Sequence, residues 1–457
     1  MIGNASQLIS FKSVRGLARD SRPPLFKLKS FMLASQLVNA RELALDLLAR
    51  CAESRALADE LLEQALAESA LSGPDRAFVT ELFYGCLRRK LSLEFLIARL
   101  ADKPPRPIIA HILSLGLYQL FILRTPAHAA VNETVALAKR YTAETETKFV
   151  NAILRRADRD RDALLEKFNA TRETEPWVYY SHPQWLWERW ASRLGRDQAA
   201  ALCEWNNQPP PIYIRINTLK ISTKPADIAA EPTNHPLCWR VTDMAGLFRS
   251  KSFANGEFYV QDPSTLVAVD MLDPQPGESV LDMCAAPGGK TTFLAQKMQN
   301  RGRIIAADST NSRLALVGEN CRRLGVNIVA TLACEGTHLD RCLRGDEFDR
   351  VLVDAPCSNT GVLRRRADLR WRMDEMEFAR LAILQGKLLA SAAKFTRAGG
   401  ILVYSTCSLE SEENERVVET FQAAHPRFAL ESTRSLFPPR DSVDGAFVAR
   451  FRNTNAA

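Results

Sequence analysis

Strand-length apolar runs alternate with helix-length segments from residue 277 onward, and this alternation constrains the fold more than any other feature of the sequence. The runs are ESVLDMCA, GRIIAAD, NIVATLAC, FDRVLVDA and GGILVYSTC. Parallel strands need crossover connections of helix length, so the pattern predicts an α/β domain with a parallel sheet and helices on both faces. Ligands of such sheets bind outside the carboxyl ends of the strands. Functional side chains are therefore expected where each run ends.

Other domains precede this one, because 457 residues exceed what a single hydrophobic core organises. Residues 36–168 carry apolar side chains at three- and four-residue spacing, which predicts an all-helical domain. The pattern changes near residue 170, and in IYIRINTLK three isoleucines, Ile212, Ile214 and Ile216, alternate with polar residues. That alternation is typical of a half-buried strand and predicts a small α+β module.

These changes also predict the domain boundaries. We expect a basic, disordered tail over 1–31, a helical domain over 32–168, a small module over 169–262 and the α/β domain over 263–457. The longest apolar stretch, 107–123, is shorter than a bilayer span and includes polar side chains. It is predicted to be a buried helix, and no membrane segment is expected.

Charge and cysteine content narrow the class of protein. Sixty Lys and Arg against 53 Asp and Glu give a net charge of +7, a mild bias toward an anionic partner. The ten cysteines and six histidines form no CxxC pair and no cluster with metal-ligand spacing, so no metal is expected. Cysteines at this density in a large chain are typical of the reducing cytoplasm. We expect a cytoplasmic protein that is a monomer.

Three strand ends predict a site for an adenosine-containing cofactor. DMCAAPGGKT places adjacent glycines before a helix, where backbone N–H groups favour an anionic group, yet it lacks the GxGxxG and GxxxxGK[ST] patterns of NAD and ATP sites. Asp308 closes the next run, where it would either accept ribose hydroxyls or cap the following helix. Glu335, in CEG, is placed to accept an adenine amino group.

Two more strand ends carry thiols, Cys357 in DAPCS and Cys407 in STCS. One cysteine at a strand end is usually a small core residue, but two within polar turns of one sheet are expected to face one pocket. A thiolate that adds to carbon 6 of a pyrimidine makes carbon 5 nucleophilic toward a methyl sulfonium. The thiol must be activated, because a free cysteine has a pKa of about 8.5 and is mostly protonated at neutral pH.

The motifs DMCAAPGGKTT, LVDAPCSNTGVLRR and YSTCSLESEEN resemble those of the NOL1/NOP2/Sun family of RNA 5-methylcytosine methyltransferases. Upstream, SHPQWLWERW and PPPIYIRINTLK resemble the family's small RNA-recognition-like module, and GPDRAFVTELFYGCLRRK and KFVNAILRR resemble a NusB-like helical RNA-binding domain. The resemblance covers roughly residues 36–452 and implies a Rossmann-like methyltransferase domain that uses S-adenosyl-L-methionine. The three-part order is similar to that of family members that methylate small-subunit (16S) ribosomal RNA.

The resemblance also implies roles for individual residues. Cys407, in the TCS motif, is implied to be the nucleophile, and Cys357, in the PCS motif, to assist release from the methylated base. Asp354 is implied to lie near the methionine end of the cofactor and the cytosine ring. The implied cofactor-binding residues are Cys284, Ala285, Ala286, Pro287, Gly288, Gly289, Lys290, Asp308, Glu335 and Asp354.

Two arginine-rich runs are candidate RNA contacts. LRRRADLRWR directly follows the PCS motif, and LRRK lies in the helical domain. Their side chains would either bind phosphates or be solvated without a ligand. The candidate residues are Arg364, Arg365, Arg366, Arg370, Arg88, Arg89 and Lys90.

The sequence departs from the family pattern in places. Glu335 stands where the family usually has Asp, and Ala446 replaces an aromatic residue in DGAF. The expected function is methylation of carbon 5 of a cytosine in 16S ribosomal RNA, with S-adenosylmethionine as methyl donor and a covalent bond between Cys407 and carbon 6. The alternatives are a transfer RNA 5-methylcytosine methyltransferase and a non-catalytic RNA-binding factor with the same fold.

Overall fold

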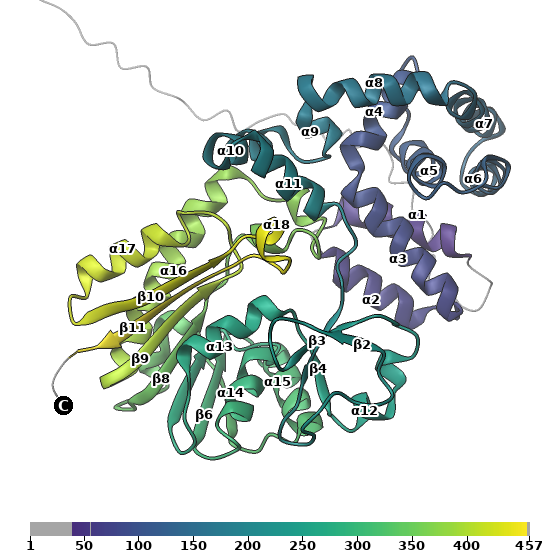
Figure 1. Ribbon diagram of the computed structural model, residues 1–457. Helices are drawn as coiled ribbons and strands as arrows, with labels where there is room; N and C mark the ends of the chain where they lie inside the picture. Colours follow the sequence, from purple (N-terminus) through teal and green to yellow (C-terminus); the bar gives the residue numbers. More distant parts are fainter. Residues whose placement is uncertain (1–38, 55, 455–457) are drawn as a thin grey trace, which may run out of the picture. The chain divides into compact units, whose positions relative to one another are not determined.

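A computed structural model describes residues 39–54 and 56–454 (Figure 1). The predicted basic tail, 1–31, lies outside the described residues. An all-helical segment comes first, then a small four-stranded sheet with its helices, then a seven-stranded sheet. None of the described helices is long and apolar enough to cross a membrane.

The helical domain is built from amphipathic helices whose apolar faces meet in one core. Its first helix is capped by Asn39, whose side chain accepts the backbone N–H groups of Arg41 and Glu42. The predicted buried helix is α5, in which Ile112 and Leu113 are completely buried. The helices are α1 (Ala40–Glu53), α2 (Ala58–Glu68), α3 (Gly73–Arg88), α4 (Lys90–Leu100), α5 (Pro107–Leu117), η1 (Tyr118–Ile122), α6 (Ala127–Tyr141), α7 (Glu144–Arg159) and α8 (Arg161–Thr174).

The small module combines helices with an antiparallel sheet of strand order β2-β3-β1-β4. The core beneath its first helices holds Trp187 and Trp190, both buried. Its elements are α9 (Pro176–Tyr179), α10 (Gln184–Leu194), α11 (Arg196–Asn206), β1 (Tyr213–Ile216), β2 (Ala230–Pro232), β3 (Cys238–Val241), η2 (Leu247–Arg249), α12 (Lys251–Ala254) and β4 (Phe258–Val260).

Strand β1 is buried on both faces, so the prediction of a half-buried strand is wrong. The reason is Arg215, a polar residue of the alternating pattern that is only 1% exposed. Its guanidinium donates to the carbonyl of Gly289, at 2.8 Å, and to the hydroxyl of Thr292, at 3.0 Å. The polar face of β1 therefore packs against the C-terminal domain instead of facing water.

The C-terminal domain contains a mixed sheet of strand order β10-β11-β9-β8-β5-β6-β7. Strands β5 to β9 run parallel, as the alternating pattern predicts, and β11 pairs antiparallel with both β9 and β10. The strands are β5 (Ser279–Met283), β6 (Arg303–Asp308), β7 (Val329–Ala333), β8 (Phe348–Asp354), β9 (Thr396–Thr406), β10 (Phe428–Leu436) and β11 (Ala446–Asn453).

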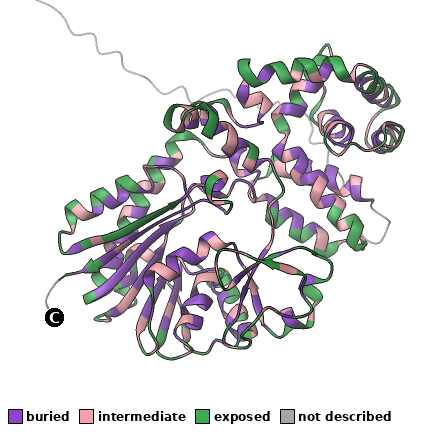
Figure 2. Cartoon of the chain, viewed as in Figure 1, coloured by how far each residue is buried: buried purple, intermediate pink, exposed green. Residues whose placement is uncertain are grey.

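Helices cover both faces of this sheet, and Figure 2 shows its central strands largely buried. On one face, strand residues such as Ile304 and Val403 pack with residues of α13, α14 and α15. On the other, strand residues such as Val351 and Leu402 pack with α16 and α17. The helices are η3 (Pro263–Leu266), α13 (Val267–Leu272), α14 (Gly289–Lys297), α15 (Asn311–Leu324), η4 (Gly336–Arg341), η5 (Thr360–Val362), η6 (Leu369–Trp371), α16 (Glu375–Phe395), α17 (Glu415–Ala424) and α18 (Pro438–Asp441).

The chain reverses its direction of strand addition at β5, which pairs with β6 on one side and β8 on the other. In open α/β sheets a ligand crevice forms at such a reversal, outside the carboxyl ends of the strands. The fold therefore places the predicted site residues of β5, β6 and β8 around one crevice. The predicted fold class, an all-helical domain and a small α+β module before a Rossmann-like domain, is confirmed, while the boundaries at 168 and 262 stay predictions.

Candidate active site

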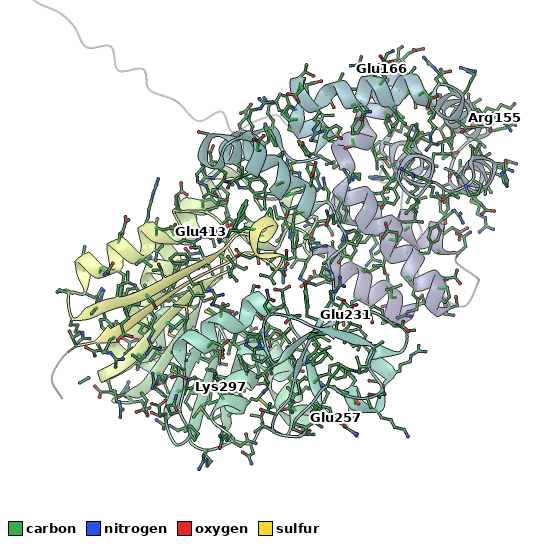
Figure 3. All side chains as sticks on the ribbon, viewed as in Figure 1. Arg155, Glu166, Glu231, Glu257, Lys297 and Glu413 are labelled. Carbon is green, nitrogen blue, oxygen red and sulfur yellow. The ribbon has the colours of Figure 1, made fainter. Side chains whose placement is uncertain are left out.

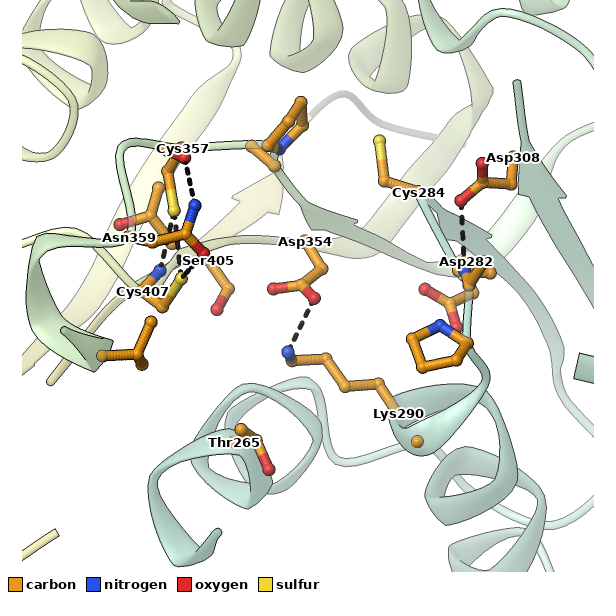
Figure 4. A pocket seen from close by; sticks show the side chains of 18 of the residues that line it. Thr265, Asp282, Cys284, Lys290, Asp308, Asp354, Cys357, Asn359, Ser405 and Cys407 are labelled. Atoms are coloured by element: carbon orange, nitrogen blue, oxygen red, sulfur yellow. Dashed lines mark hydrogen bonds and ion pairs between the residues drawn. The ribbon is translucent and has the colours of Figure 1, made fainter. Parts of the chain in front are cut away.

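A cavity of about 1020 Å³ opens at the carboxyl ends of the parallel strands. It is lined by every residue of the predicted catalytic and cofactor sets except Gly288. Figure 4 shows the thiols of Cys357 and Cys407 at one end of the cavity and Asp308 at the other, with an ion pair between them. The sequence prediction that these strand ends share one pocket matches this arrangement.

The loop after β5 approaches the cavity through unusual backbone geometry. Cys284 has φ 62° and Gly288 has φ 103°, both in the left-handed region. A Cβ at Gly288 would also lie 3.1 Å from the Cα of Val317, so the close packing of α15 favours glycine there. Burial raises the pKa of the Cys284 thiol to about 12, so this cysteine stays protonated near neutral pH.

Asp308 bonds to that loop from the end of β6. Its buried carboxylate accepts the N–H of Ala286, at 3.1 Å, and pairs with Arg313, at 3.0 Å. The following helix, α15, begins at Asn311 after the N-cap residue Thr310, so Asp308 is not the cap of that helix. Of the two roles that the sequence leaves open for Asp308, the structure therefore removes helix capping.

Glu335 lines the cavity at the carboxyl end of β7. Its side chain is 73% exposed, and one oxygen lies 3.5 Å from Nδ1 of His338. Apolar side chains of α16, those of Leu384 and Leu388, line the cavity as well. This end of the cavity thus combines an accessible carboxylate with an apolar surface, which suits a flat heterocycle that carries an amino group.

An ion pair lies in the middle of the cavity. Nζ of Lys290, on α14, lies 2.7 Å from Oδ2 of Asp354, at the end of β8 (Figure 4). Burial opposes the charge of Lys290, but Asp354, together with Cys407 and Asp282, outweighs burial and raises the pKa of Lys290. Asp282, completely buried nearby, accepts the hydroxyl of Thr291 at 2.6 Å, and burial raises its pKa to about 7.

The two thiols lie side by side, because β8 and β9 are neighbours in the sheet. Sγ of Cys357 is 3.1 Å from Sγ of Cys407, and the N–H of Cys407 donates to Sγ of Cys357 at 3.3 Å. The hydrogen bond with Cys407, together with burial, raises the pKa of Cys357 well above its usual range. Cys357 is therefore held as a thiol beside its neighbour.

Asn359 is a site residue that the sequence reasoning missed. Its Oδ1 accepts the thiol of Cys407 at 3.2 Å, and its Nδ2 donates to the carbonyl of Cys357 at 2.7 Å. It lies in the left-handed region, with φ 61°. Asn is enriched in that region, so the sequence DAPCSNTG carried a signal for a tight turn at this position.

The arginine run after the cysteine turn lies mostly inside the protein. Arg370 is completely buried and donates to the carbonyls of Ser181, at 3.3 Å, and Asn206, at 2.9 Å. Arg364 is also buried, and its guanidinium lies 4.2 Å from the ring centroid of Trp205. Burial lowers the pKa of Arg370 to about 9. Both residues join the C-terminal domain to the small module, which differs from the expectation that they face RNA.

Two further arginines of this run, Arg365 and Arg366, line the cavity. Arg365 pairs with two buried carboxylates, Asp262 at 2.8 Å and Asp444 at 2.5 Å. Burial, reinforced by Asp262, raises the pKa of Asp444 to about 7. Arg366 is half-buried at the cavity wall. Arg366 is therefore the residue of this run that is best placed to meet an anionic ligand.

The second basic run, at the end of α3, is partly buried too. Arg88 is buried, and burial lowers the pKa of both Arg88 and Arg89. Lys90 is exposed, and its ammonium group lies 5.2 Å from the ring centroid of Trp371. Only Lys90 of these three presents an exposed charge to solvent.

Three family matches follow the order of the three structural segments. Residues 38–159 match the NusB family, and residues 182–227 match a ferredoxin-like domain of RsmF/B-like methyltransferases. Residues 269–452 match the family described as 16S rRNA methyltransferase RsmB/F. The resemblance to methyltransferases with a NusB-like domain is thereby confirmed.

Two solved structures are similar over long parts of the chain. PH0851 is 26% identical with a TM-score of 0.73, and the match covers 92% of this chain and 100% of that chain. A methyltransferase homologue from Pyrococcus horikoshii is 30% identical with a TM-score of 0.55, covering 61% and 97%.

Two curated relatives cover most of this sequence. A probable ribosomal RNA small subunit methyltransferase B of Synechocystis is 37% identical over 91% of this chain and 100% of the relative. The Bacillus subtilis protein of the same name is 32% identical over 85% and 89%. The chain therefore belongs to the RsmB/F family of 16S rRNA methyltransferases.

Proposed function

We propose that the protein methylates carbon 5 of a cytosine in 16S ribosomal RNA, with S-adenosyl-L-methionine as methyl donor and Cys407 as the nucleophile. The observation that carries this proposal is the position of two thiols, 3.1 Å apart, in the cavity that Asp308 and Glu335 also line. Methylation of a pyrimidine carbon needs a nucleophile for carbon 6, and a cysteine supplies it through a temporary covalent bond.

The residues present fit the cofactor. The buried carboxylate of Asp308 suits ribose hydroxyls, and the accessible carboxylate of Glu335, beside the apolar side chains of α16, suits the adenine amino group. The loop 284–290 would also contact the cofactor. When bound, S-adenosylmethionine supplies an electrophilic methyl group.

The chain's own residues account for attack and release. Sγ of Cys407 forms a bond to carbon 6, and the positive charge of Lys290 interacts favourably with a thiolate at Cys407. After carbon 5 is methylated, the carbon 5 proton passes to a water molecule, the double bond re-forms and the carbon 6–sulfur bond breaks. The thiol of Cys357 stabilises the departing sulfur by donating a hydrogen bond, so that Cys407 leaves as a thiolate, while Asp354 binds the edge of the cytosine.

The domain order supports ribosomal RNA as the substrate. Relatives named ribosomal RNA small subunit methyltransferase B match nearly their whole length, with the NusB-like domain included. We propose that this domain, over 32–168, and the small module, over 169–262, bind RNA around the target, with Arg366 and Lys90 as phosphate contacts. Sequence-specific RNA binding usually targets unpaired bases, and the target base must leave its stack to enter the cavity.

The test is an assay with purified protein and tritium-labelled S-adenosylmethionine. Label should enter protein-free 16S ribosomal RNA, and digestion should release it as 5-methylcytidine, with none from transfer RNA. Label in transfer RNA would support the transfer RNA alternative. An absence of transfer to any RNA, with intact RNA binding, would support the non-catalytic factor.

A further inference from the structure

Glu413 lies next to the two cysteine turns but outside the lining of the cavity. It belongs to the segment between β9 and α17, where Figure 3 labels it. The residue is completely buried and does not line the cavity. A carboxylate in such a position is costly unless hydrogen bonds satisfy it, so its partners indicate what it does.

The carboxylate bonds to both cysteine turns at once. One oxygen, Oε1, accepts the hydroxyl of Ser358 and, at 2.6 Å, the hydroxyl of Ser408. The other, Oε2, accepts the N–H of Ser358 at 2.9 Å. Ser358 directly follows Cys357, and Ser408 directly follows Cys407. Glu413 is therefore a direct link between the segments that carry the two thiols.

Further hydrogen bonds fix the link in place. Nε2 of Gln385, on α16, donates to Oε2 of Glu413 and to the carbonyl of Pro356, each at 2.9 Å. The hydroxyl of Tyr404, on β9, donates to the carbonyl of Glu413 at 2.6 Å. Hydrogen bonds thus connect the glutamate to the proline before Cys357 and to the strand that leads to Cys407.

The hydrogen-bond donors of the link are neutral groups. Four neutral donors surround the two oxygens, and none of the ion pairs among residues 39–54 and 56–454 includes Glu413. A carboxylate accepts four such bonds without donating any. The hydrogen bond with Cys407, burial and the charges of Cys407 and Glu413 all raise the pKa of Cys357.

We propose that Glu413 is a positioning residue for the methylation reaction: by tying Ser358 to Ser408 it holds the thiol of Cys357 beside Sγ of Cys407, ready for release. The inference rests on the proposed function, because a release role for Cys357 is part of it. It adds a residue outside the cavity that acts through Cys357 and touches neither RNA nor cofactor. Without the link, Cys357 is present but misplaced, and the covalent complex breaks down slowly.

The test compares Glu413→Gln with Glu410→Gln. Glu410 is equally buried in the same segment, but its carboxylate bonds to Arg189, Arg193 and Trp190 of α10 instead of the cysteine turns. Each variant is incubated with 16S ribosomal RNA and S-adenosylmethionine, and the protein–RNA complex that survives a denaturing gel is quantified. Glu413→Gln should accumulate at least about 10-fold more of this complex than the wild type, since small displacements at a reacting centre have large rate effects.

Glu410→Gln should lower the melting temperature without accumulating the complex. If Glu413→Gln unfolds, Ser408→Ala, which removes one hydroxyl from the link, carries the same expectation with a smaller effect. A folded Glu413→Gln that accumulates no more complex than Glu410→Gln overturns the inference, and so does a folded Ser408→Ala without accumulation.

A further variant, Cys357→Ala, distinguishes a failure of the positioning inference from a failure of the proposed function. Accumulation with Cys357→Ala but not with Glu413→Gln refutes only the positioning role. An active Cys357→Ala that accumulates no complex refutes the release role in the proposed function itself, and the positioning inference fails with it.

Discussion

The ammonium group of Lys290 lies 2.7 Å from a carboxylate oxygen of Asp354 and so joins α14 to the turn that carries Cys357. The Lys290 side chain is 14% exposed and that of Asp354 is 32% exposed. Charged side chains as enclosed as that of Lys290 are rarely without a partner, so we expect the pair to stabilise the fold as well as to serve the proposed reaction.

Replacing Asp354 with Asn should weaken both properties. The change leaves a largely buried ammonium group without its counter-ion, which we expect to lower the free energy of unfolding by about 3 kcal/mol. It also removes the proposed contact to the cytosine edge, so methyl transfer should fall. Urea unfolding and the tritium assay measure the two effects. Asp340→Asn is the control, because its pair with Lys394 is 4.0 Å long and exposed, and such pairs contribute at most about 1 kcal/mol. Equal losses in both variants would contradict the expectation.

Replacing Cys407 with Ala should abolish methylation. The proposed nucleophile is lost, so the rate should fall at least about 10³-fold, as for other enzymes that lose a nucleophile. Cofactor affinity, measured by calorimetry, should stay within about 3-fold, since the thiol lies at the other end of the cavity from Asp308. Cys342→Ala, at an exposed free cysteine, should keep full activity. Turnover by Cys407→Ala near the wild-type rate would refute the assignment.

Replacing Cys357 with Ala should trap the protein on RNA. The bond between Cys407 and carbon 6 still forms, but the neighbouring thiol that assists its breakage is gone. A denaturing gel should show a protein–RNA complex, and the double variant Cys357→Ala with Cys407→Ala should show none. A complex that persists in the double variant would mean that another residue makes the bond.

Replacing Gly361 with Ala should force the two cysteine turns apart. A Cβ there would lie 2.7 Å from the carbonyl oxygen of Cys407 and 2.8 Å from the Cα of Gly445. We expect a loss of about 1–3 kcal/mol in the free energy of unfolding and reduced methyl transfer. The matched control is Gly386→Ala on α16, where a Cβ meets nothing within 4 Å. There alanine should stabilise the helix by up to about 1 kcal/mol, and the reverse ranking of the two variants would refute the argument.

The stability of the protein should depend on pH through Asp282. Its pKa is about 7 in the folded protein, above the value of about 3.9 for an unfolded chain. The folded state thus binds more protons between these values, so the free energy of unfolding should decrease as pH rises from 4 to 7. Asp282→Asn should make this decrease shallower, although Asp444, also near 7, retains part of it. Urea unfolding at several pH values measures the slope, and an unchanged slope would contradict the assignment.

The sequence was most informative where local pattern and chemistry coincide. Parallel strands follow from the alternation after residue 277, and parallel strands bring their carboxyl ends together, so Asp308, Asp354, Cys357 and Cys407 could be assigned to one pocket. Their distances could not be predicted, because they depend on register between strands far apart in the chain.

Contacts between domains leave no local signal, and there the predictions failed or were absent. Arg215 follows a surface pattern yet is buried against α14, and Arg370 belongs to a basic run yet bonds to backbone carbonyls. Glu413 looks like one of several acids in SLESEEN, and only the fold places it between Ser358 and Ser408.

Because Arg215 bonds to Gly289 and Thr292, the C-terminal domain depends on a residue of the small module and cannot be transferred to another protein on its own. A fragment that starts at residue 263 would lose the guanidinium that holds the first turn of α14, next to Lys290. A fusion of this domain to a different RNA-binding domain would therefore have to include the strand β1. Exchange of the helical domain alone, with the small module kept, would preserve this support.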